Sequence, residues 1–397
     1  MNPNTKSIIM ESYEMNNDLL EIRRYIHENA EVGYNTVKTS NYIKKKLKEI
    51  GIDFKEIEKT GIVADIGSGD KTILLRADVD ALPMYESNDL PFKSNEKSSH
   101  CCGHDLHATM LLGAAKILKQ REDELNGTVR LMFQRDEEGG NGAKTMVDNG
   151  VLDDRTIDAA LALHVNAKSP LGVLEYGYGK TFASNDSFEI VVKGRGGHGA
   201  RAYETIDPIC VATNIINSLY NVIAREVDPF SHVLFSVTSI EANSTFNIIP
   251  DSAKIKGTFR TYDDEQRKHL LNRFETITTA VAQSFMATAE FNVVKSLSAL
   301  TTSTEFTDKV LKLSQELGDE IRVNMEPVVK RGSEDFAYIS EKIKNNAYLF
   351  IGAGKNREEG NEFGQHNSKV IFNEDVLPIG AALLSNVAYL WLLDEDN

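Results

Sequence analysis

A chain of 397 residues with 41% hydrophobic and 26% charged residues has the composition of a soluble globular protein and is long enough for two domains. Its net charge of −15 argues against nucleic acid or an anionic membrane as a partner, because their phosphates would repel it. Three cysteines form no disulfide framework and the polar N-terminus has no apolar signal core, so we expect a cytoplasmic protein.

The first half of the chain alternates between helix and strand patterns. Apolar residues recur at helical spacing over residues 12–29 and 37–50. Strand-like runs and further helical stretches follow, and this alternation predicts a central, mostly parallel sheet with helices on both faces. The expected strands are 61–66, 72–76, 128–133 and 159–163, and the further helices are 106–120 and 142–148.

The pattern changes after residue 183. The order of elements becomes β-α-β-β-α-β, which predicts a ferredoxin-like domain. Its strands are expected at 187–193, 233–240, 253–261 and 289–294, and its helices at 206–224 and 265–286. Helix–strand alternation resumes after about residue 301. We therefore expect an α/β domain made of residues 1–182 and 296–397, with a ferredoxin-like domain at 183–295 inserted into it.

Residues 376–393 carry no charge and approach the length of a membrane span. The segment contains proline, glycine, serine and asparagine, and acidic rather than basic residues flank it. We predict a buried C-terminal helix, and a membrane span is the less favoured interpretation.

The segment at residues 99–107, Ser-His-Cys-Cys-Gly-His-Asp-Leu-His, concentrates metal-binding side chains. Thiolate, imidazole and carboxylate groups are the common ligands of transition metals. Cys102 could be a small buried hydrophobic side chain, as free cysteines usually are, but its place two residues before His104 favours ligation. Cys101 is expected to be the packing residue of the pair.

Acidic and imidazole side chains also follow the predicted strands. Functional groups of α/β sheets gather at the carboxyl ends of strands, so these side chains should meet at one edge with Cys102 and His104. They are Asp78 and Asp80 after 72–76, Glu137 and Glu138 after 128–133, and His164 at the end of 159–163.

The adjacent glutamates Glu137 and Glu138 suit metal-assisted hydrolysis, which needs a ligand and a free carboxylate as general base. Neighbouring residues in an extended chain point in opposite directions, so one glutamate can bind metal while the other handles the attacking water. The alternative is a solvated acidic turn before Gly139. The neighbouring motifs favour the functional interpretation.

These motifs resemble the metal-dependent amidohydrolases that include aminoacylases, hippurate hydrolases and indole-acetyl-amino-acid hydrolases. The resemblance runs nearly end to end, and its Cys-Gly-His-Asp motif with a later Glu-Glu is specific to this branch. Its segments are 23–27 with residue 31, 76–83, 100–107, 133–134, 137–138, 196–198, 207–208, 247–250, 257–260, 333–336 and 366–368.

The resemblance implies two divalent metal ions held by five side chains, with Glu137 as the general base. The implied ligands are Cys102, His104, Glu138, His164 and His366. His100 and His107 are not implied as ligands. The donor set suits Mn²⁺, Zn²⁺ or Co²⁺. The thiolate leans towards Zn²⁺, and the resemblance favours Mn²⁺ equally.

Two aspartates are candidates for orienting a ligand histidine, Asp80 and Asp105. Asp80 could equally cap the following turn. His27 and Glu31 fit a simpler role as helix-surface residues.

The resemblance also implies a catalytic domain with an inserted lid that dimerises. Within the lid it assigns His198 to oxyanion stabilisation, often across the dimer, and Asn247 and Arg260 to the substrate carboxylate. The alternatives are a turn histidine permitted by its glycines and an exposed strand arginine. We therefore expect a homodimer or higher homo-oligomer.

The chain departs from the family pattern near several of these motifs. Arg135-Asp136 stands where Pro-Ala is usual, Ala202 lies near the usual place of a proline after His198, and Ala30 replaces another proline. These changes remove no catalytic group, and they bear on the choice of substrate.

We expect hydrolysis of the amide bond of N-acyl or aminoacyl amino acids. A dipeptidase or aminopeptidase is the nearer alternative. A non-catalytic metal- or carboxylate-binding protein would be expected to lack the general base or a ligand, and this sequence has both.

Overall fold

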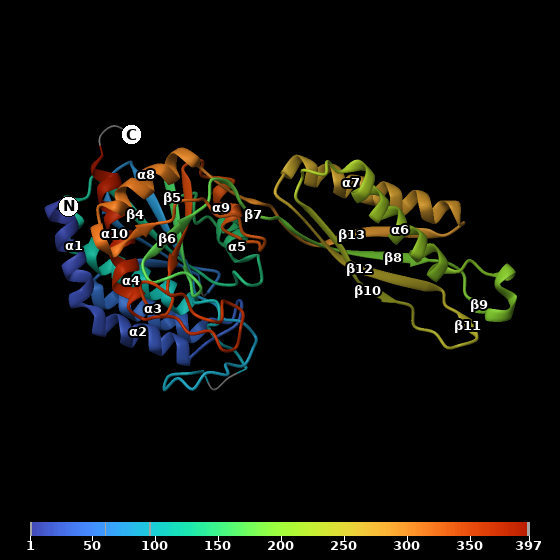
Figure 1. Cartoon of the computed structure of the whole chain (residues 1–397), viewed down its shortest axis with the longest axis horizontal. Helices are drawn as coiled ribbons and strands as arrows, with labels where there is room; N and C mark the ends of the chain where they lie inside the picture. The colour runs from blue at the N-terminus through green and yellow to red at the C-terminus, as the bar shows by residue number, and fades with distance from the viewer. Residues whose placement is uncertain (1, 60, 95–96, 395–397) are drawn as a thin grey trace. The chain divides into compact units, whose positions relative to one another are not determined.

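The computed structural model describes residues 2–59, 61–94 and 97–394, which divide into two compact units (Figure 1). The first unit comprises Met1–Gly179, Thr301–Val329 and Asp335–Asn397. The second comprises Lys180–Leu300 and Lys330–Glu334. The predicted fold class, an α/β protein with a large, mostly parallel sheet and a βαββαβ insertion, is confirmed.

The first unit is built on an eight-stranded sheet in the order β1-β2-β4-β3-β5-β16-β6-β15, counted over the described residues. Its central strands β4, β3, β5 and β16 are parallel to one another. Strand β2 is antiparallel to its neighbour β4, and β6 is antiparallel to its neighbour β16. The strands are β1 (Phe54–Ile57), β2 (Gly61–Ser68), β3 (Thr72–Asp78), β4 (Gly127–Gln134), β5 (Ala159–Asn166), β6 (Val173–Tyr176), β15 (Arg322–Val323) and β16 (Asn346–Gly352).

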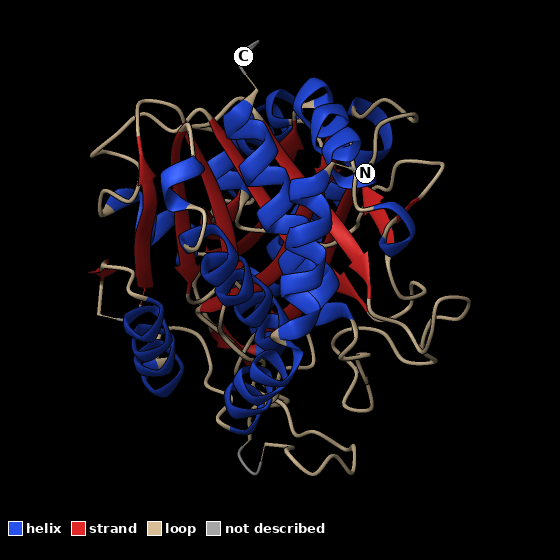
Figure 2. Cartoon of the chain, turned by 90° about the vertical axis from the view of Figure 1, so that its left-hand side faces the viewer, coloured by secondary structure: helices blue, strands red, loops and turns tan. Residues whose placement is uncertain are grey.

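Helices flank this sheet, and Figure 2 shows several of them crossing the face turned to the viewer. They are α1 (Pro3–Glu14), α2 (Asn16–Glu28), α3 (Val37–Ile50), α4 (His104–Lys119), α5 (Gly142–Asp148), α8 (Thr304–Gln315), α9 (Ala337–Ser340) and α10 (Val376–Leu393). The N-terminal prediction was partly wrong, because two helices that meet at Met15 replace the single helix expected at 12–29. The backbone at Met15 leaves helical geometry at φ −87° and ψ 7°.

The C-terminal helix α10 is buried, as predicted. It packs against α4 and α1 in the main core of the unit. It is long and apolar enough to cross a membrane, with a mean hydropathy of 1.8, yet 89% of it is buried inside the protein. An uncharged helix of this kind suits a position surrounded by other core elements.

The second unit is a four-stranded antiparallel sheet in the order β10-β12-β8-β13, with two helices packed on it. Phe188, Phe259 and Phe274 form the centre of its separate core. Helix α6 begins at Pro208, where Asp207 caps it by accepting the backbone N–H of Ile209 at 2.8 Å. The elements are β8 (Asn185–Lys193), α6 (Pro208–Glu226), β10 (Val233–Glu241), β12 (Ser252–Thr261), α7 (Asp264–Ser284) and β13 (Thr288–Leu297).

The described residues also form two pairs of short strands. They are β7 (Gly179–Phe182), which pairs with β14 (Leu300–Thr302), and β9 (Gly197–His198), which pairs with β11 (Ile248–Ile249).

Candidate metal centre and active site

Three neighbouring parallel strands deliver side chains to one edge of the main sheet. Strand β3 ends at Asp78, β4 ends just before the glutamate pair, and β5 carries His164 near its end. Helix α4 begins at His104, and Gly103 before it has φ 98°, a left-handed conformation that favours glycine. A Cβ atom on Gly103 would lie 2.4 Å from Val165 Cγ2, so the close approach of this loop to β5 also requires glycine.

All five predicted metal ligands come together at this edge in two overlapping groups. Cys102, His104 and His164 offer donor atoms within 4.8 Å of one another, and so do Cys102, Glu138 and His366. Cys102 belongs to both groups. Its Sγ atom lies 3.5 Å from His164 Nε2, and His366 Nε2 lies 3.4 Å from Glu138 Oε1.

The buried donor atoms fit divalent metal ions. Both ring nitrogens of His104 and Oε1 of Glu138 are buried without a hydrogen-bond partner among the described residues. Such polar atoms are costly to bury unless something binds them. Sulfur, imidazole and carboxylate donors in this number suit two ions of the Zn²⁺ or Mn²⁺ type. Burial raises the pKa of the Cys102 thiol to about 12 in the metal-free chain, so binding of a metal would displace its proton.

The glutamate pair lies in a turn, and the expectation that it follows β4 in extended conformation was wrong. Strand β4 ends at Gln134, and the backbone N–H of Gly140 donates to the carbonyl of Glu137 at 2.6 Å, which closes the turn. Asp136 before the pair has φ 55°. Glu137 still offers a carboxylate oxygen within 4.8 Å of donor atoms of His104 and Glu138.

Asp80 holds the main chain of this turn. Its Oδ1 accepts the backbone N–H of Glu137 at 3.0 Å, and its Oδ2 accepts that of Glu138 at 3.3 Å. Its Oδ1 also lies 3.6 Å from Nδ1 of His104. One buried carboxylate therefore contacts a predicted ligand and the backbone of both glutamates.

His107 uses both ring nitrogens in hydrogen bonds and has none left for a metal. Its Nδ1–H donates to Asp78 at 2.5 Å, and its Nε2 accepts the backbone N–H of Val165 at 2.9 Å. Burial lowers the pKa of His107, which keeps the ring neutral in this tautomer.

Among the described residues, the carboxylate of Asp105 is hydrogen-bonded to two residues of helix α2 and to none of the five predicted ligands. Its carboxylate accepts hydrogen bonds from Arg23 Nε at 2.7 Å and from His27 Nδ1 at 2.8 Å. His27 is 4% exposed, so its interpretation as a helix-surface residue was wrong. Nε2 of His27 donates to Glu86 at 2.9 Å, and the ring is therefore held between two carboxylates.

A buried polar network behind the cluster was not predicted. Arg76, in the middle of β3, donates to Gln134 and Asp78 at 2.8 Å each and to Asp335 at 3.1 Å. Asp335 also accepts the backbone N–H of Ala143 at the start of α5. An arginine within an otherwise apolar strand was the sequence signal for this network.

The three residues that were assigned to a lid from the sequence lie in the second unit. His198 is exposed in β9, and its Nδ1 accepts the backbone N–H of Ala200 at 3.1 Å. Asn247 is also exposed, and its carbonyl accepts the backbone N–H of Gly199 at 2.8 Å. Arg260 is half-buried in β12. Their predicted roles stay predictions.

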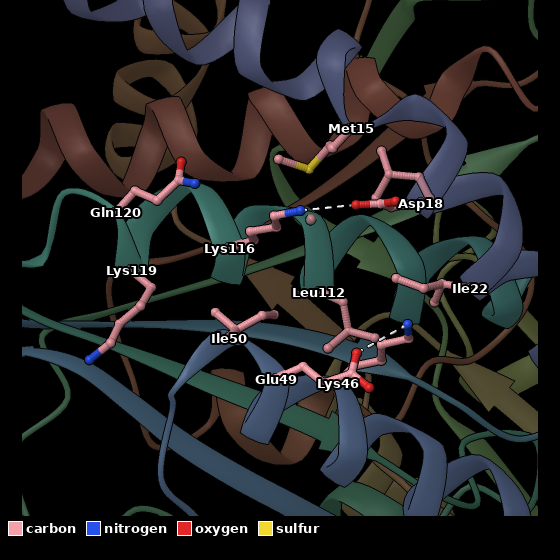
Figure 3. Close-up of a pocket in the computed structure, with 12 residues that line it drawn as sticks. Met15, Asp18, Ile22, Lys46, Glu49, Ile50, Leu112, Lys116, Lys119 and Gln120 are labelled. Carbon is pink, nitrogen blue, oxygen red and sulfur yellow. Dashed lines mark hydrogen bonds and ion pairs between the residues drawn. The ribbon is translucent and has the colours of Figure 1, made fainter.

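The first unit also has a separate hollow of about 470 Å³ between α2, α3 and α4 (Figure 3). It lies towards the C-terminal end of α4, whereas the metal-ligand groups gather at its N-terminal end. Its basic side chains are paired, Lys116 with Asp18 at 2.9 Å and Lys46 with Glu49 at 3.2 Å. None of the predicted site residues lines it.

Comparison with known proteins identifies the family. Residues 74–389 match the model of peptidase family M20/M25/M40. The chain belongs to this family. A thermostable carboxypeptidase of Saccharolobus solfataricus is 37% identical over 93% of this chain and 94% of its own length. An IAA-amino acid hydrolase of Arabidopsis thaliana is 38% identical over 95% of this chain and 86% of its own.

A solved structure gives the same answer. The dinuclear metal-binding M20 peptidase of Bacillus subtilis has a TM-score of 0.81 and 30% identity, and the match covers 96% of this chain and 99% of the other. The resemblance inferred from the motifs is thus confirmed. This M20 protein is a hydrolase that acts on amide bonds.

Proposed function

We propose that this M20 enzyme hydrolyses the amide bond of N-acyl amino acids at the cluster on the edge of the main sheet. Cys102, His104, Glu138, His164 and His366 would hold two divalent ions. The observation that carries the proposal is the convergence of these five donor groups from separate segments, with the carboxylate of Glu137 beside them.

The general base in this proposal is Glu137. Divalent ions bound at the cluster would acidify the attacking water and polarise the amide carbonyl. Glu137 removes a proton from the water and passes it to the nitrogen of the departing amine. Asp80 keeps the backbone of Glu137 in place during this exchange. Mn²⁺, Zn²⁺ and Co²⁺ all suit the donors, and the single thiolate favours Zn²⁺.

Residues 183–295 form the proposed lid, and residues 1–182 and 296–397 the catalytic domain. His198 would stabilise the oxyanion, and Asn247 and Arg260 would bind the carboxylate of the substrate, a task that suits a guanidinium group. We further propose a homodimer formed through the lid in a cytoplasmic enzyme. The edge strand β10 supports this dimer, because it leaves Leu234 and Ile240 about half exposed.

A carboxypeptidase is the second candidate, and it is favoured by the likeness to the Saccharolobus carboxypeptidase. Both activities release an amino acid with a free α-carboxylate, which the proposed Arg260 contact would recognise. An aminopeptidase needs a site for a substrate ammonium group instead. The two leading candidates therefore differ in the group they accept on the acyl side of the bond, a simple acyl group in the first and a peptide in the second.

The test is a substrate panel assayed with Mn²⁺, Zn²⁺ and Co²⁺ in turn. N-acetyl, N-benzoyl and indole-acetyl amino acids represent the first candidate, and free or N-blocked dipeptides represent the peptidases. Preferred hydrolysis of acyl amino acids supports the proposal, and preferred hydrolysis of dipeptides supports the alternative. Arg260→Lys should raise KM for every substrate that carries a free carboxylate and leave an amidated analogue unaffected.

A further inference from the structure

Gln365 and His164 donate hydrogen bonds to the same backbone carbonyl. The oxygen of Val165 accepts His164 Nδ1–H at 2.7 Å and Gln365 Nε2–H at 2.5 Å. Because a carbonyl only accepts hydrogen bonds, the proton of the His164 ring lies on Nδ1. Its Nε2 then carries no proton and has the lone pair that a metal ion would need. This atom lies 3.5 Å from Cys102 Sγ.

Val165 is also held through its backbone N–H group. This N–H donates to His107 Nε2 at 2.9 Å, and the Nδ1–H of His107 donates to Asp78. Val165 is fully buried, and Gly103 packs closely against its side chain. The backbone of Val165 is therefore held firmly beside His164.

Gln365 also precedes His366, the last of the proposed ligands along the chain. His366 has φ 63°, a left-handed conformation that few residues other than glycine adopt and that needs support from its surroundings. The backbone N–H of His366 donates to the carbonyl of Cys101 at 3.0 Å. The side chain of Gln365 adds a second attachment of this loop, on the strand that carries His164.

We propose that Gln365 is a positioning residue that couples the two halves of the metal cluster. Through the Val165 carbonyl it fixes the ring of His164, which belongs to one group of donors, and it anchors the turn of His366, which belongs to the other. Gln365 binds neither metal nor substrate in this role. The inference rests on the ligand set proposed above.

The test compares Gln365→Met with a matched control, Asn361→Leu. Methionine keeps the length of glutamine and removes the N–H donor. Asn361 lies in the same loop and donates to the carbonyls of Ile371 at 2.6 Å and of Ala353 at 3.4 Å, so its substitution removes comparable side-chain-to-backbone bonds that do not end on Val165. Metal-free proteins are titrated with Co²⁺ and followed by calorimetry and visible absorption, and kcat and KM are measured at saturating Co²⁺.

We expect the wild type and Asn361→Leu to bind two Co²⁺ ions alike. Gln365→Met should bind at least one ion about 10- to 100-fold more weakly, with a changed absorption spectrum and a lower kcat at unchanged KM. Thermal unfolding of the metal-free variants checks that the loss is not one of folding.

Two results would overturn the inference: wild-type affinity and spectrum in Gln365→Met, or an equal loss of affinity in both variants. If the wild type itself binds no Co²⁺, the proposed ligand set fails, and the two failures are thereby distinguished.

Discussion

The carboxylate of Asp80 accepts the backbone N–H of Glu137 at 3.0 Å. The proposed general base is therefore positioned through its main chain as well as through its own side chain. The same aspartate accepts the N–H of Glu138, so both glutamates depend on one buried side chain that follows β3. Small errors in the placement of a catalytic group lower rates strongly, and this contact has consequences that can be measured.

Replacing Asp80 by asparagine should lower kcat about 10- to 100-fold with little change in KM. The asparagine amide offers one oxygen where the carboxylate offered two, and its NH₂ group faces a backbone N–H that also donates. The check is steady-state kinetics on the best substrate of the panel, with metal content measured in parallel. An unchanged kcat would show that the turn holds its conformation without Asp80.

Replacing Glu137 by glutamine should leave both ions bound and lower kcat by about 10²- to 10⁴-fold, because the amide cannot accept the proton of water. Elemental analysis of the purified variant and single-turnover kinetics provide the measurement. Glu138→Gln is the matched control, and we expect it to lose metal as well as activity. Retained turnover in Glu137→Gln would exclude its role as general base.

Removal of divalent ions should abolish hydrolysis. Addition of Zn²⁺, Mn²⁺ or Co²⁺ should then restore it. His164→Ala and His366→Ala should each weaken metal binding, since each removes a donor from a different group. His107→Asn should retain more metal than either, because neither of its ring nitrogens is available. Undiminished activity after exhaustive chelation would contradict the metal mechanism.

The buried His27 makes stability depend on pH. Burial lowers the pKa of His27, but Asp105 and Glu86 raise it, and the net pKa lies above the usual 6.5. A raised pKa in the folded state means that the stabilisation is complete below about pH 6.5 and is lost as the pH rises through the folded pKa.

The melting-temperature difference between the wild type and His27→Gln should therefore be largest below pH 6.5 and shrink at higher pH. The same exchange at the exposed His232 controls for the chemistry of the substitution. A difference that grows with pH would reverse the assigned sign.

Truncating Asp335 to alanine should lower the free energy of unfolding by about 3–5 kcal/mol, because it leaves the buried Arg76 without one of its partners. Denaturant unfolding of the metal-free protein measures this loss. Substituting the exposed Asp319 in the same unit should change little. An equal effect of the two substitutions would show that burial of the pair is unimportant.

Periodicity predicted the regular elements of the fold well. Helices α3 and α5 have the predicted bounds, and a left-handed glycine at position 51, with φ 80°, ends α3. The break at Met15 was missed because no proline or glycine marks it. Strand β16 was also missed, since a short, fully buried apolar run gives no alternation to read.

The metal cluster could be predicted because cysteine and histidine at close spacing leave a signal in the sequence. The supporting contacts could not, because many of them end on backbone atoms. Gln365 donates to a carbonyl and Asp80 accepts backbone N–H groups, and no side-chain pattern records such bonds. The contact between Asp105 and His27 joins two side chains, but it could not be predicted because the two residues are 78 positions apart in the sequence.

The donor groups of the cluster are spread from Cys102 to His366, a separation that covers the whole of the second unit. During synthesis, Cys102 leaves the ribosome long before His366 exists. A nascent polypeptide therefore cannot complete this set of donors until His366 has been added, and products truncated before that residue would keep Cys102 and His104 without one of their proposed partners.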